Sequence, residues 1–338
     1  MKFLSVCSGI EAASIAWEPL GWKAIAFSEI DKFPSAVLAH HWPDIPNLGD
    51  MTKYNEWTIR PNLIVGGTPC QSYSVAGLRK GLKDPRGNLT LVFLGMVKKF
   101  NPTWVVWENV PGVLSDKTNA FGQFINGLVK LGYDCAWRVL DAKHFGVPQR
   151  RRRVFLVANT RNRPHPGKVL LQPECLQGYI EKNKKKSEIN APMFNRSIGN
   201  KNKTWWDGSK TSPCLTTTSN NQRMPDNGKL AAVYDVNFCD VGASAKFITA
   251  AKNLTGTLTT NASRFAVNVK HTLRRLTPIE CERLQGFPDN HTQIPWRGKT
   301  KENCPDGPRY KACGNSMAVP VMRWIGEQIQ RVENECGK

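Results

Sequence analysis

Residues 62–70 read NLIVGGTPC, an apolar run followed at once by a turn of glycine and proline. A short apolar run that ends in turn residues is typical of a strand buried on both faces, as the strands of parallel sheets are. Comparable runs recur up to residue 160. We therefore expect six strands, at Phe3–Cys7, Ala24–Ser28, Asn62–Val65, Trp104–Trp107, Ala136–Leu140 and Val154–Ala158.

The intervals between these runs have the apolar spacing of helices. The predicted helices are Ala12–Leu20, Lys32–His40, Leu91–Phe100 and Phe121–Leu131. Strands that alternate with helices indicate an α/β fold, with a doubly wound, mostly parallel sheet covered by helices on both faces. Ligands of such folds bind at the carboxyl ends of the strands, so chemistry is expected at that edge.

The composition changes over residues 161–272, where apolar periodicity fades and Lys, Asn, Ser and Thr accumulate. This stretch is too long for a connecting loop and indicates a second module or a disordered insert. Helical patterns return at Leu276–Gln285 and Ala318–Val332. We expect the last helix to pack back on the sheet, which predicts a large domain of residues 1–165 plus 312–338 and a smaller one of residues 166–311.

The charge balance indicates the kind of partner. The chain has 47 Lys and Arg against 27 Asp and Glu, a net charge of +20, which favours a polyanion such as nucleic acid. No run is long and apolar enough to span a bilayer, so no membrane partner is expected. The ten cysteines have no C-x-x-C spacing and the histidines no metal-ligand spacing. We expect reduced thiols, no metal site and a cytoplasmic protein.

Two turns at predicted strand ends carry reactive side chains. Cys70 follows two glycines and a proline, which expose its thiol on a constrained turn, and a nucleophile and a buried structural cysteine are equally favoured there. Glu108 ends the run WVVWE, where partial burial would raise its pKa and suit an acid or hydrogen-bond donor. A capping or salt-bridged glutamate is favoured for Glu108 alone, but the two side chains at neighbouring strand ends form a plausible thiol–acid pair.

Four arginines in a row, residues 150–153, lead directly into a predicted strand. Strand alternation places Arg151 and Arg153 on one face and Arg150 and Arg152 on the other. Because four adjacent positive charges repel, we expect at least one face to meet anions or polar acceptors. A solvated basic run is the alternative, and the apolar strand that follows without a linker weakens it.

The first predicted strand is followed by a glycine turn, the usual place for a nucleotide cofactor in an α/β sheet. The turn lacks the G-x-G-x-x-G fingerprint, and Glu11 at the helix start would repel a pyrophosphate. Glu29 ends the second strand, where it can accept hydrogen bonds from ribose hydroxyls, and Asp50 is placed to bind an adenine amine. These features fit an adenosine ligand without phosphate.

In their order along the chain, these segments resemble the motif series of the cytosine-5 DNA methyltransferases, which use S-adenosylmethionine. The resemblance covers residues 1–160 and 271–330. It implies that Cys70, between Pro69 and Gln71, is the nucleophile and that Glu108, in Glu-Asn-Val, is the acid that protonates the base. The arginines of a Gln-x-Arg-x-Arg motif would bind the target base, and this motif falls on Gln149, Arg151 and Arg153.

The resemblance also implies a class I methyltransferase fold and S-adenosylmethionine as the cofactor, with S-adenosylhomocysteine as the product. The residues expected at the cofactor are Ser8, Gly9, Ile10, Glu29, Ile30, Asp50, Met51, Pro69, Asn315 and Ser316. The chain departs from the family where a Phe-x-Gly-x-Gly opening is replaced by Cys7-Ser8-Gly9-Ile10-Glu11. This departure bears on the detail of the cofactor contacts.

The implied partner is double-stranded DNA, bound by a monomer whose residues 166–311 would recognise the target, with restriction-modification as the setting. Cytosine carbon 6 is inaccessible in a stacked duplex, so the target base must be flipped out. The residues expected to contact DNA are Gln71, Ser74, Lys80, Arg86 and Thr257. The last of these lies in a hydroxyl-rich segment, Gly256–Arg264, that resembles Ser212–Asn220.

Three other functions are weighed against this one. An enzyme acting on RNA is disfavoured because the middle region is long and basic. A non-catalytic DNA-binding relative is disfavoured because Cys70, Glu108, Arg151 and Arg153 are all present. A dinucleotide oxidoreductase lacks its glycine fingerprint here and leaves the two reactive turns unexplained.

Overall fold

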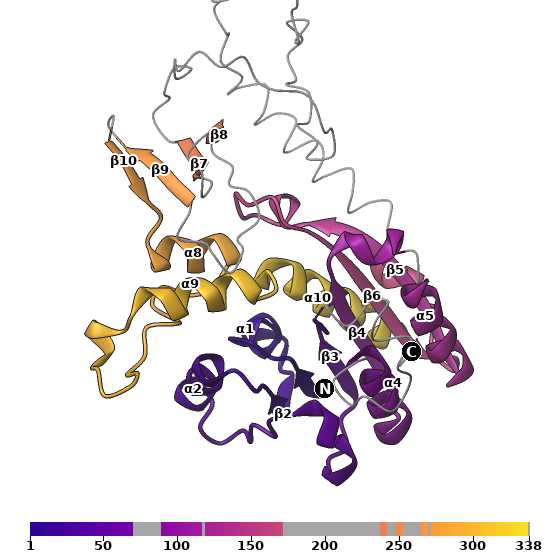
Figure 1. The fold of residues 1–338 in the computed structure, drawn as a ribbon. Coiled ribbons are helices and arrows are strands. Elements are labelled where there is room, and N and C mark those ends of the chain that lie inside the picture. Colours follow the sequence, from indigo (N-terminus) through magenta and orange to yellow (C-terminus); the bar gives the residue numbers. More distant parts are fainter. Residues whose placement is uncertain are drawn as a thin grey trace, which may run out of the picture. The chain divides into compact units, whose positions relative to one another are not determined.

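The computed structural model describes residues 1–69, 89–116, 119–171, 237–241, 248–252, 265–269 and 272–336. The chain separates into two compact units, Met1–Gln172 with Tyr234–Lys338, and Pro173–Val233. The second unit lies outside the described residues, so the following concerns the first (Figure 1). The predicted boundaries between the large and small domains stay a prediction.

A six-stranded sheet forms the centre of this unit, in the order β2-β1-β3-β4-β6-β5. Its strands are β1 (Lys2–Val6), β2 (Lys23–Ser28), β3 (Leu63–Gly66), β4 (Trp104–Asn109), β5 (Tyr133–Asp141) and β6 (Arg152–Thr160). The pairs β1–β2, β1–β3 and β3–β4 are parallel, whereas β6 runs antiparallel to both β4 and β5. The six predicted strands and the mostly parallel sheet are confirmed.

Helices lie on both faces of the sheet, in agreement with the predicted doubly wound fold (Figure 1). The α-helices are α1 (Ala12–Trp17), α2 (Lys32–His41), α4 (Leu89–Phe100), α5 (Ala120–Lys130), α6 (Gly167–Leu170), α8 (Pro278–Gln285), α9 (Asp306–Asn315) and α10 (Val319–Cys336). The 3-10 helices are η1 (Glu18–Leu20), η2 (Met51–Glu56), η5 (Pro111–Ser115), η6 (Ala142–His144) and η8 (Lys301–Asn303). The helix expected over Ala12–Leu20 ends as an α-helix at Trp17 and continues as the 3-10 helix η1 from Glu18. Pro19 lies in the first turn of η1, and it has no backbone N–H with which to continue the α-helical hydrogen bonds. Helices α6 and α9 were not predicted.

Strand alternation divides the core into two hydrophobic clusters, one on each face. Along β3, Leu63 and Val65 belong to the cluster that also holds the buried side chains of α1 and α10. Ile64 belongs to the other cluster, with the buried side chains of α4 and α5. Both faces of the sheet are therefore dry, which explains why its central strands are mostly apolar and why β3, LIVG, is apolar throughout.

The C-terminal helix α10 packs against α1, as its amphipathic pattern predicts. The indole Nε1 of Trp17 donates a hydrogen bond of 2.7 Å to the backbone oxygen of Met322. Two further indoles donate to side chains of α10, Trp22 to Gln330 and Trp104 to Glu333, each at 2.7 Å. The two ends of the chain therefore share one core.

A second sheet lies within the region of changed composition. It is antiparallel, in the order β10-β9-β7-β8, and its strands are β7 (Asn237–Val241), β8 (Ile248–Lys252), β9 (Phe265–Val269) and β10 (Thr272–Arg275). The two similar hydroxyl-rich segments lie outside the described residues. Beyond β10, the buried side chains of Leu276, Leu284 and Ile294 join the cluster that holds α1 and α10.

Candidate active site

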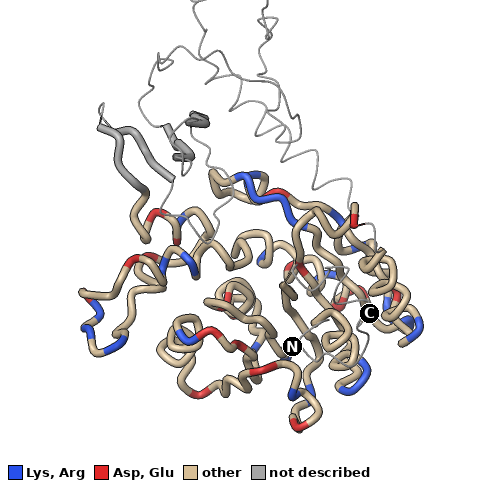
Figure 2. Tube along the Cα trace, viewed as in Figure 1, with Lys and Arg blue, Asp and Glu red and all other residues tan. Residues whose placement is uncertain are grey.

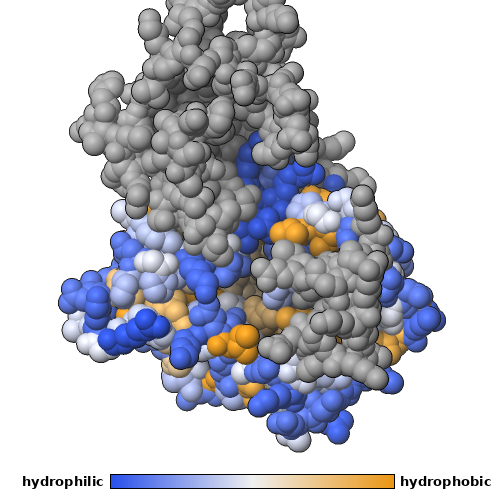
Figure 3. Space-filling model, viewed as in Figure 1, coloured by the Kyte–Doolittle hydropathy of each residue, from blue (hydrophilic) through white to orange (hydrophobic). Residues whose placement is uncertain are grey.

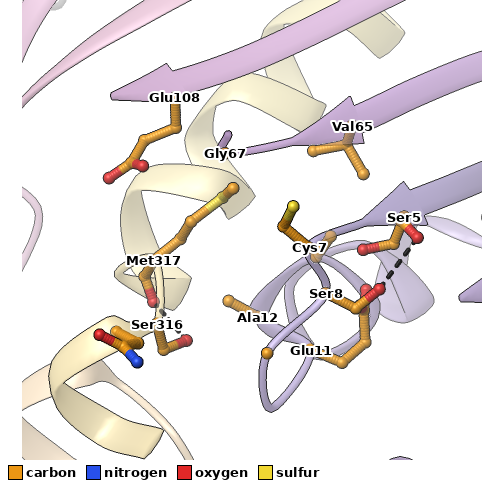
Figure 4. Close-up of a pocket in the computed structure, with 13 residues that line it drawn as sticks. Ser5, Cys7, Ser8, Glu11, Ala12, Val65, Gly67, Glu108, Ser316 and Met317 are labelled. Carbon is orange, nitrogen blue, oxygen red and sulfur yellow. Dashed lines mark hydrogen bonds between the residues drawn. The ribbon is translucent and has the colours of Figure 1, made fainter. Parts of the chain in front are cut away.

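The strand order places a crevice at the carboxyl ends of β1 and β3. The chain leaves β1 for β2 on one side and returns to β3 on the other, which makes this the switch point where α/β sheets bind ligands. A small pocket opens there, lined from β1, β3 and β4, from the start of α1 and from the segment after α9. Figure 4 shows Glu108, Ser316 and Met317 on one side of it and Cys7, Ser8 and Ala12 on the other.

The structure brings several of the predicted residues together in this pocket. Predicted residues that line it are Ser8, Gly9, Glu108, Asn315 and Ser316. Asn315 and Ser316 come from the end of α9, some 300 positions after the first turn. Six predicted residues lie outside the described part of the chain, namely Cys70, Gln71, Ser74, Lys80, Arg86 and Thr257.

The turn after β1 has an unusual backbone. Cys7, Gly9 and Glu11 have φ angles of 49°, 56° and 64°, in the left-handed region that favours glycine. Glu11 occupies the position of the second glycine in the Phe-x-Gly-x-Gly pattern, and it keeps the backbone conformation that suits that glycine. Its side chain caps α1 by accepting a hydrogen bond of 2.9 Å from the backbone N–H of Ser14.

The Glu29 carboxylate ties this turn to the end of β2. Its two oxygens accept hydrogen bonds of 2.8 Å from the backbone N–H groups of Gly9 and Asp31. Ile30, the next residue, is 75% exposed, whereas Ile10 is fully buried. Asp50 caps η2 by accepting from the Thr52 N–H at 2.9 Å. The roles predicted for these residues toward ribose and adenine stay predictions.

Cys7 lies at the pocket but is no candidate nucleophile. Burial, with the nearby charges of Glu29 and Asp50, raises the pKa of its thiol to about 12. The thiol therefore stays protonated, and its Sγ lies 3.6 Å from the sulfur of Met51. Because a thiolate is needed for attack, Cys7 is not suited to act as a nucleophile.

Glu108 is buried at the carboxyl end of β4. Burial raises the pKa of its carboxyl group, and the charges of Arg151 and Arg153 oppose this rise. Arg153 Nε lies 3.2 Å from Glu108 Oε1. A Cβ atom on Gly67 would lie 3.0 Å from Glu108 Oε2, so the glycine lets the turn after β3 approach the carboxylate closely. That turn leads directly into Pro69 and Cys70.

Asn109 holds this turn in place, a role that sequence reasoning missed. Its side-chain N–H donates a hydrogen bond of 2.9 Å to the backbone oxygen of Thr68, and its Oδ1 accepts from Val110 N–H at 2.9 Å. Trp107 adds a hydrogen bond of 3.2 Å to the Thr68 hydroxyl. Asn109 stands beside Glu108 in the sequence, but its partner Thr68 lies in the turn that follows another strand, β3.

The arginine run has the predicted alternation. Arg151 is buried and Arg152 exposed, while Arg153 reaches Glu108. Arg151 donates to the backbone oxygen of Gly314 at 3.2 Å, and Gln149 donates to that of Leu284 at 2.9 Å. Neither Gln149 nor Arg151 lines the pocket, and both link the start of β6 to the segments around α8 and α9.

A buried network behind the pocket was also missed. His291 lies at hydrogen-bond distance, 2.8 Å, from the backbone oxygen of Ile10 in the first turn. Burial lowers the pKa of His291 to about 4, so the ring is neutral at neutral pH. The segment that carries His291 is held by Glu282, which accepts from Thr292 N–H at 2.9 Å and pairs with Arg309 at 3.2 Å. No local pattern marks this network, because its members come from separate elements.

Among the described residues, no three His, Cys, Asp or Glu side chains form a group that could hold a metal ion. Within the same ranges, no helix is long and apolar enough to cross a membrane.

Solved structures with the same fold include two methyltransferases. A DNA modification methyltransferase encoded within an E. coli prophage superposes with a TM-score of 0.61 at 18% identity, over 99% of both chains. The Dnmt2 methyltransferase of S. pombe gives a TM-score of 0.59 at 16% identity, over 98% of this chain and 99% of that one. At such identities the likeness shows the fold alone, and it confirms the class I methyltransferase architecture.

Sequence comparison is more specific. The type II methyltransferase M.SsoII of Shigella sonnei is 27% identical over 97% of this chain and 79% of its own length. A protein of Escherichia phage P1, described as a DNA N-6-adenine-methyltransferase, is 37% identical over 97% of this chain, which spans 61% of that relative. The sequence profile described as C-5 cytosine-specific DNA methylase matches residues 1–331. The chain therefore belongs to the C-5 cytosine-specific DNA methylase family.

Proposed function

We propose that this protein transfers a methyl group from S-adenosylmethionine to carbon 5 of cytosine in double-stranded DNA, with Cys70 as the nucleophile. The observation that carries the proposal is the position of Glu108. It is a buried acid with a raised pKa, it lines the switch-point pocket, and it touches the turn that leads into Cys70. Membership of the C-5 cytosine-specific DNA methylase family links this geometry to the methylation of cytosine.

The pocket residues fit an adenosine-type cofactor. The carboxylates of Glu29 and Asp50 stand at its edge near Ser8 and Gly9, and no lysine, arginine or histidine is among its described lining residues. An acidic pocket suits a ligand with positively charged groups and no phosphate. When bound, S-adenosylmethionine supplies an electrophilic methyl group at this edge of the sheet.

Glu108 and the arginines would prepare the target base. A carboxyl group with a raised pKa can donate a hydrogen bond to ring N3 of cytosine, which prevents negative charge from building up there. Arg153, in contact with Glu108, is the better placed arginine for the exocyclic oxygen beside N3. Arg151, buried against Gly314, would act by holding the site together.

Cys70 would activate carbon 5. Its thiolate adds to carbon 6, and the electron pair that moves to carbon 5 makes that atom nucleophilic. After methylation, carbon 5 loses its proton to solvent and the thiolate leaves from carbon 6, which restores the aromatic ring. This geometry requires the cytosine to be flipped out of the duplex.

A basic surface supports DNA as the substrate. Figure 2 shows Lys and Arg along the segment that leads into β6, and Figure 3 shows a strongly hydrophilic surface where β5 and β6 meet. Arg150 and Arg152 are exposed there, on the face opposite Arg151 and Arg153. Exposed arginines of this kind suit phosphate contacts. The monomeric state and the cytoplasmic location remain part of this proposal.

A second candidate function comes from the phage P1 relative, whose description names adenine N6 as the methylated position. Methylation of an exocyclic amine uses the nitrogen lone pair directly and needs no cysteine nucleophile. The profile match over residues 1–331 favours cytosine. The two products, 5-methylcytosine and N6-methyladenine, are different nucleobases, so a single analysis of the modified nucleosides distinguishes the two functions.

The experiment is mass spectrometry of nucleosides from plasmid DNA treated with the protein and S-adenosylmethionine. We expect 5-methylcytosine, and bisulfite sequencing of the same DNA would then give the recognition sequence. Cys70→Ser should abolish the product while DNA binding survives. N6-methyladenine as the product would overturn the proposal, and a Cys70→Ser variant with substantial turnover would overturn its mechanism.

A further inference from the structure

Glu11 is a buried carboxylate in the cofactor pocket with one unused oxygen. Its side chain is fully buried and lines the pocket. Oε1 accepts hydrogen bonds from the N–H and the hydroxyl of Ser14, at 2.9 and 3.1 Å. Oε2 is also buried and makes no hydrogen bond of normal geometry with the described residues, although the Ser5 side chain lies close enough to lower the pKa of Glu11. Leaving such an atom unsatisfied is costly, so a ligand donor is the natural partner.

The charges around the pocket favour a cationic donor. Glu11 and Glu108 both line it, and the lining residues that the structure describes include no Lys, Arg or His. Glu108 already has Arg153 as its partner. A positive group beside Glu11 would reduce the cost of burying that charge.

We propose that the Glu11 carboxylate binds the ammonium group at the amino-acid end of S-adenosylmethionine. This inference rests on the proposed function and adds the group that Glu11 recognises. The cofactor carries two positive centres, but only the ammonium has N–H donors that can satisfy Oε2. The sulfonium has none, so a hydrogen-bonding role selects the ammonium.

The backbone at Glu11 provides two informative substitutions. Glu11→Gln keeps the shape of the side chain and removes its charge. Glu11→Gly removes the side chain at a φ of 64°, which glycine adopts without strain. Ser14→Ala is the matched control, because it removes a hydroxyl that binds Oε1 and leaves Oε2 unchanged.

The test is calorimetric binding of three ligands to the full chain. They are S-adenosylmethionine, S-adenosylhomocysteine, which keeps the ammonium and lacks the sulfonium, and an S-adenosylmethionine analogue with hydrogen in place of the α-amino group. We expect the wild-type protein and Ser14→Ala to bind the analogue about 10- to 100-fold more weakly than S-adenosylmethionine, since hydrogen bonds to charged groups have this strength. Glu11→Gln and Glu11→Gly should lose most of this preference.

The outcomes separate the two proposals. If both Glu11 variants prefer the amino ligands as strongly as the wild type does, the role of Glu11 is overturned while the proposed function stands. If the wild-type protein binds neither S-adenosylmethionine nor S-adenosylhomocysteine, both fail. Circular dichroism of each variant shows that a lost preference does not come from unfolding.

Discussion

Glu108 and Glu11 are two carboxyl groups that the fold buries at the same edge of the sheet. Burial raises the pKa of both, to about 7 for Glu11. Their partners differ, because Arg153 stands beside Glu108 whereas Glu11 has hydroxyl and amide donors from Ser14. Two carboxyl groups in different surroundings can take different roles in one site, here toward the target base and toward the cofactor.

Glu108→Gln tests the proposed acid. Glutamine keeps the size of the side chain but has no acidic proton to share with the base, so we expect the rate of methylation to fall by about 10²- to 10⁴-fold. Glu56→Gln, at an exposed glutamate of η2, is the control and should keep the wild-type rate. A Glu108→Gln enzyme with a wild-type rate would remove this residue from the reaction.

Glu11 also predicts a pH dependence of stability. Its pKa in the folded protein, about 7, lies above the ordinary value of 4.5, so the unfolded chain ionises first as the pH rises. The stability contribution is full below pH 4.5 and is lost between pH 4.5 and 7, by about 3 kcal/mol at most. We expect urea unfolding at pH 5 and pH 8 to show a smaller fall for Glu11→Gln than for the wild type. An equal fall in both would contradict the assignment.

At the scale of elements, α8 and α9 are held together by buried polar contacts as well as by apolar packing. Thr277 and Glu280 form a capping box at the start of α8, which fixes where the helix begins. Glu282, fully buried on the same helix, pairs with Arg309 of α9 and accepts from the segment that carries His291. The pair therefore orders the segment that contacts the turn after β1.

Arg309→Met tests this network. Methionine keeps much of the packing volume but leaves the Glu282 carboxylate buried without its cation, so we expect a loss of about 3–5 kcal/mol in the free energy of unfolding. The control is Arg283→Ala on α8, whose ion pair with Asp289 is exposed and should leave stability unchanged. Denaturant titration measures both, and equal effects of the two substitutions would show that burial of the pair is unimportant.

At the scale of the molecule, the first and last elements of the chain form one core. Helix α1 contacts α10 through Trp17, whose indole hydrogen-bonds to the backbone of that helix. The close approach depends on Gly326, where a Cβ atom would lie 2.5 Å from the Trp17 ring. Asn315 and Ser316 precede α10 directly, so this contact also sets their position in the pocket.

Gly326→Ala should therefore destabilise the whole unit. We expect a loss of about 1–3 kcal/mol in the free energy of unfolding, because the extra methyl forces two packed helices apart. Gly307→Ala is the matched control, since this glycine also lies in a helix but a Cβ atom there would meet nothing within 4 Å. If both alanines have the same effect on thermal unfolding, the close contact does not matter.

Local sequence pattern was sufficient for the strands of the central sheet, for most of the helices around it and for the edge at which the site lies, whereas α6, α9 and the strands β7 to β10 were not predicted. Six strands and four helices before residue 171 follow from apolar spacing, because each element must turn an apolar face or an apolar run toward a core. Glycine and proline turns after β3 and β4 marked the strand ends where Glu108 and Pro69 lie. The family resemblance, which rests on the order of these motifs, is confirmed.

Only the tertiary structure decided which of these residues meet. The antiparallel direction of β6, the position of Arg151 and Arg153 near Glu108, and the contact of His291 with Ile10 all join segments far apart in the chain. Such contacts depend on strand order and on which faces pack together, and no local pattern encodes them. The amino-acid sequence by itself determined the strands of the central sheet and the chemistry of the side chains at their ends. Packing decided which of these side chains meet, because contacts between distant segments depend on how the elements pack against one another.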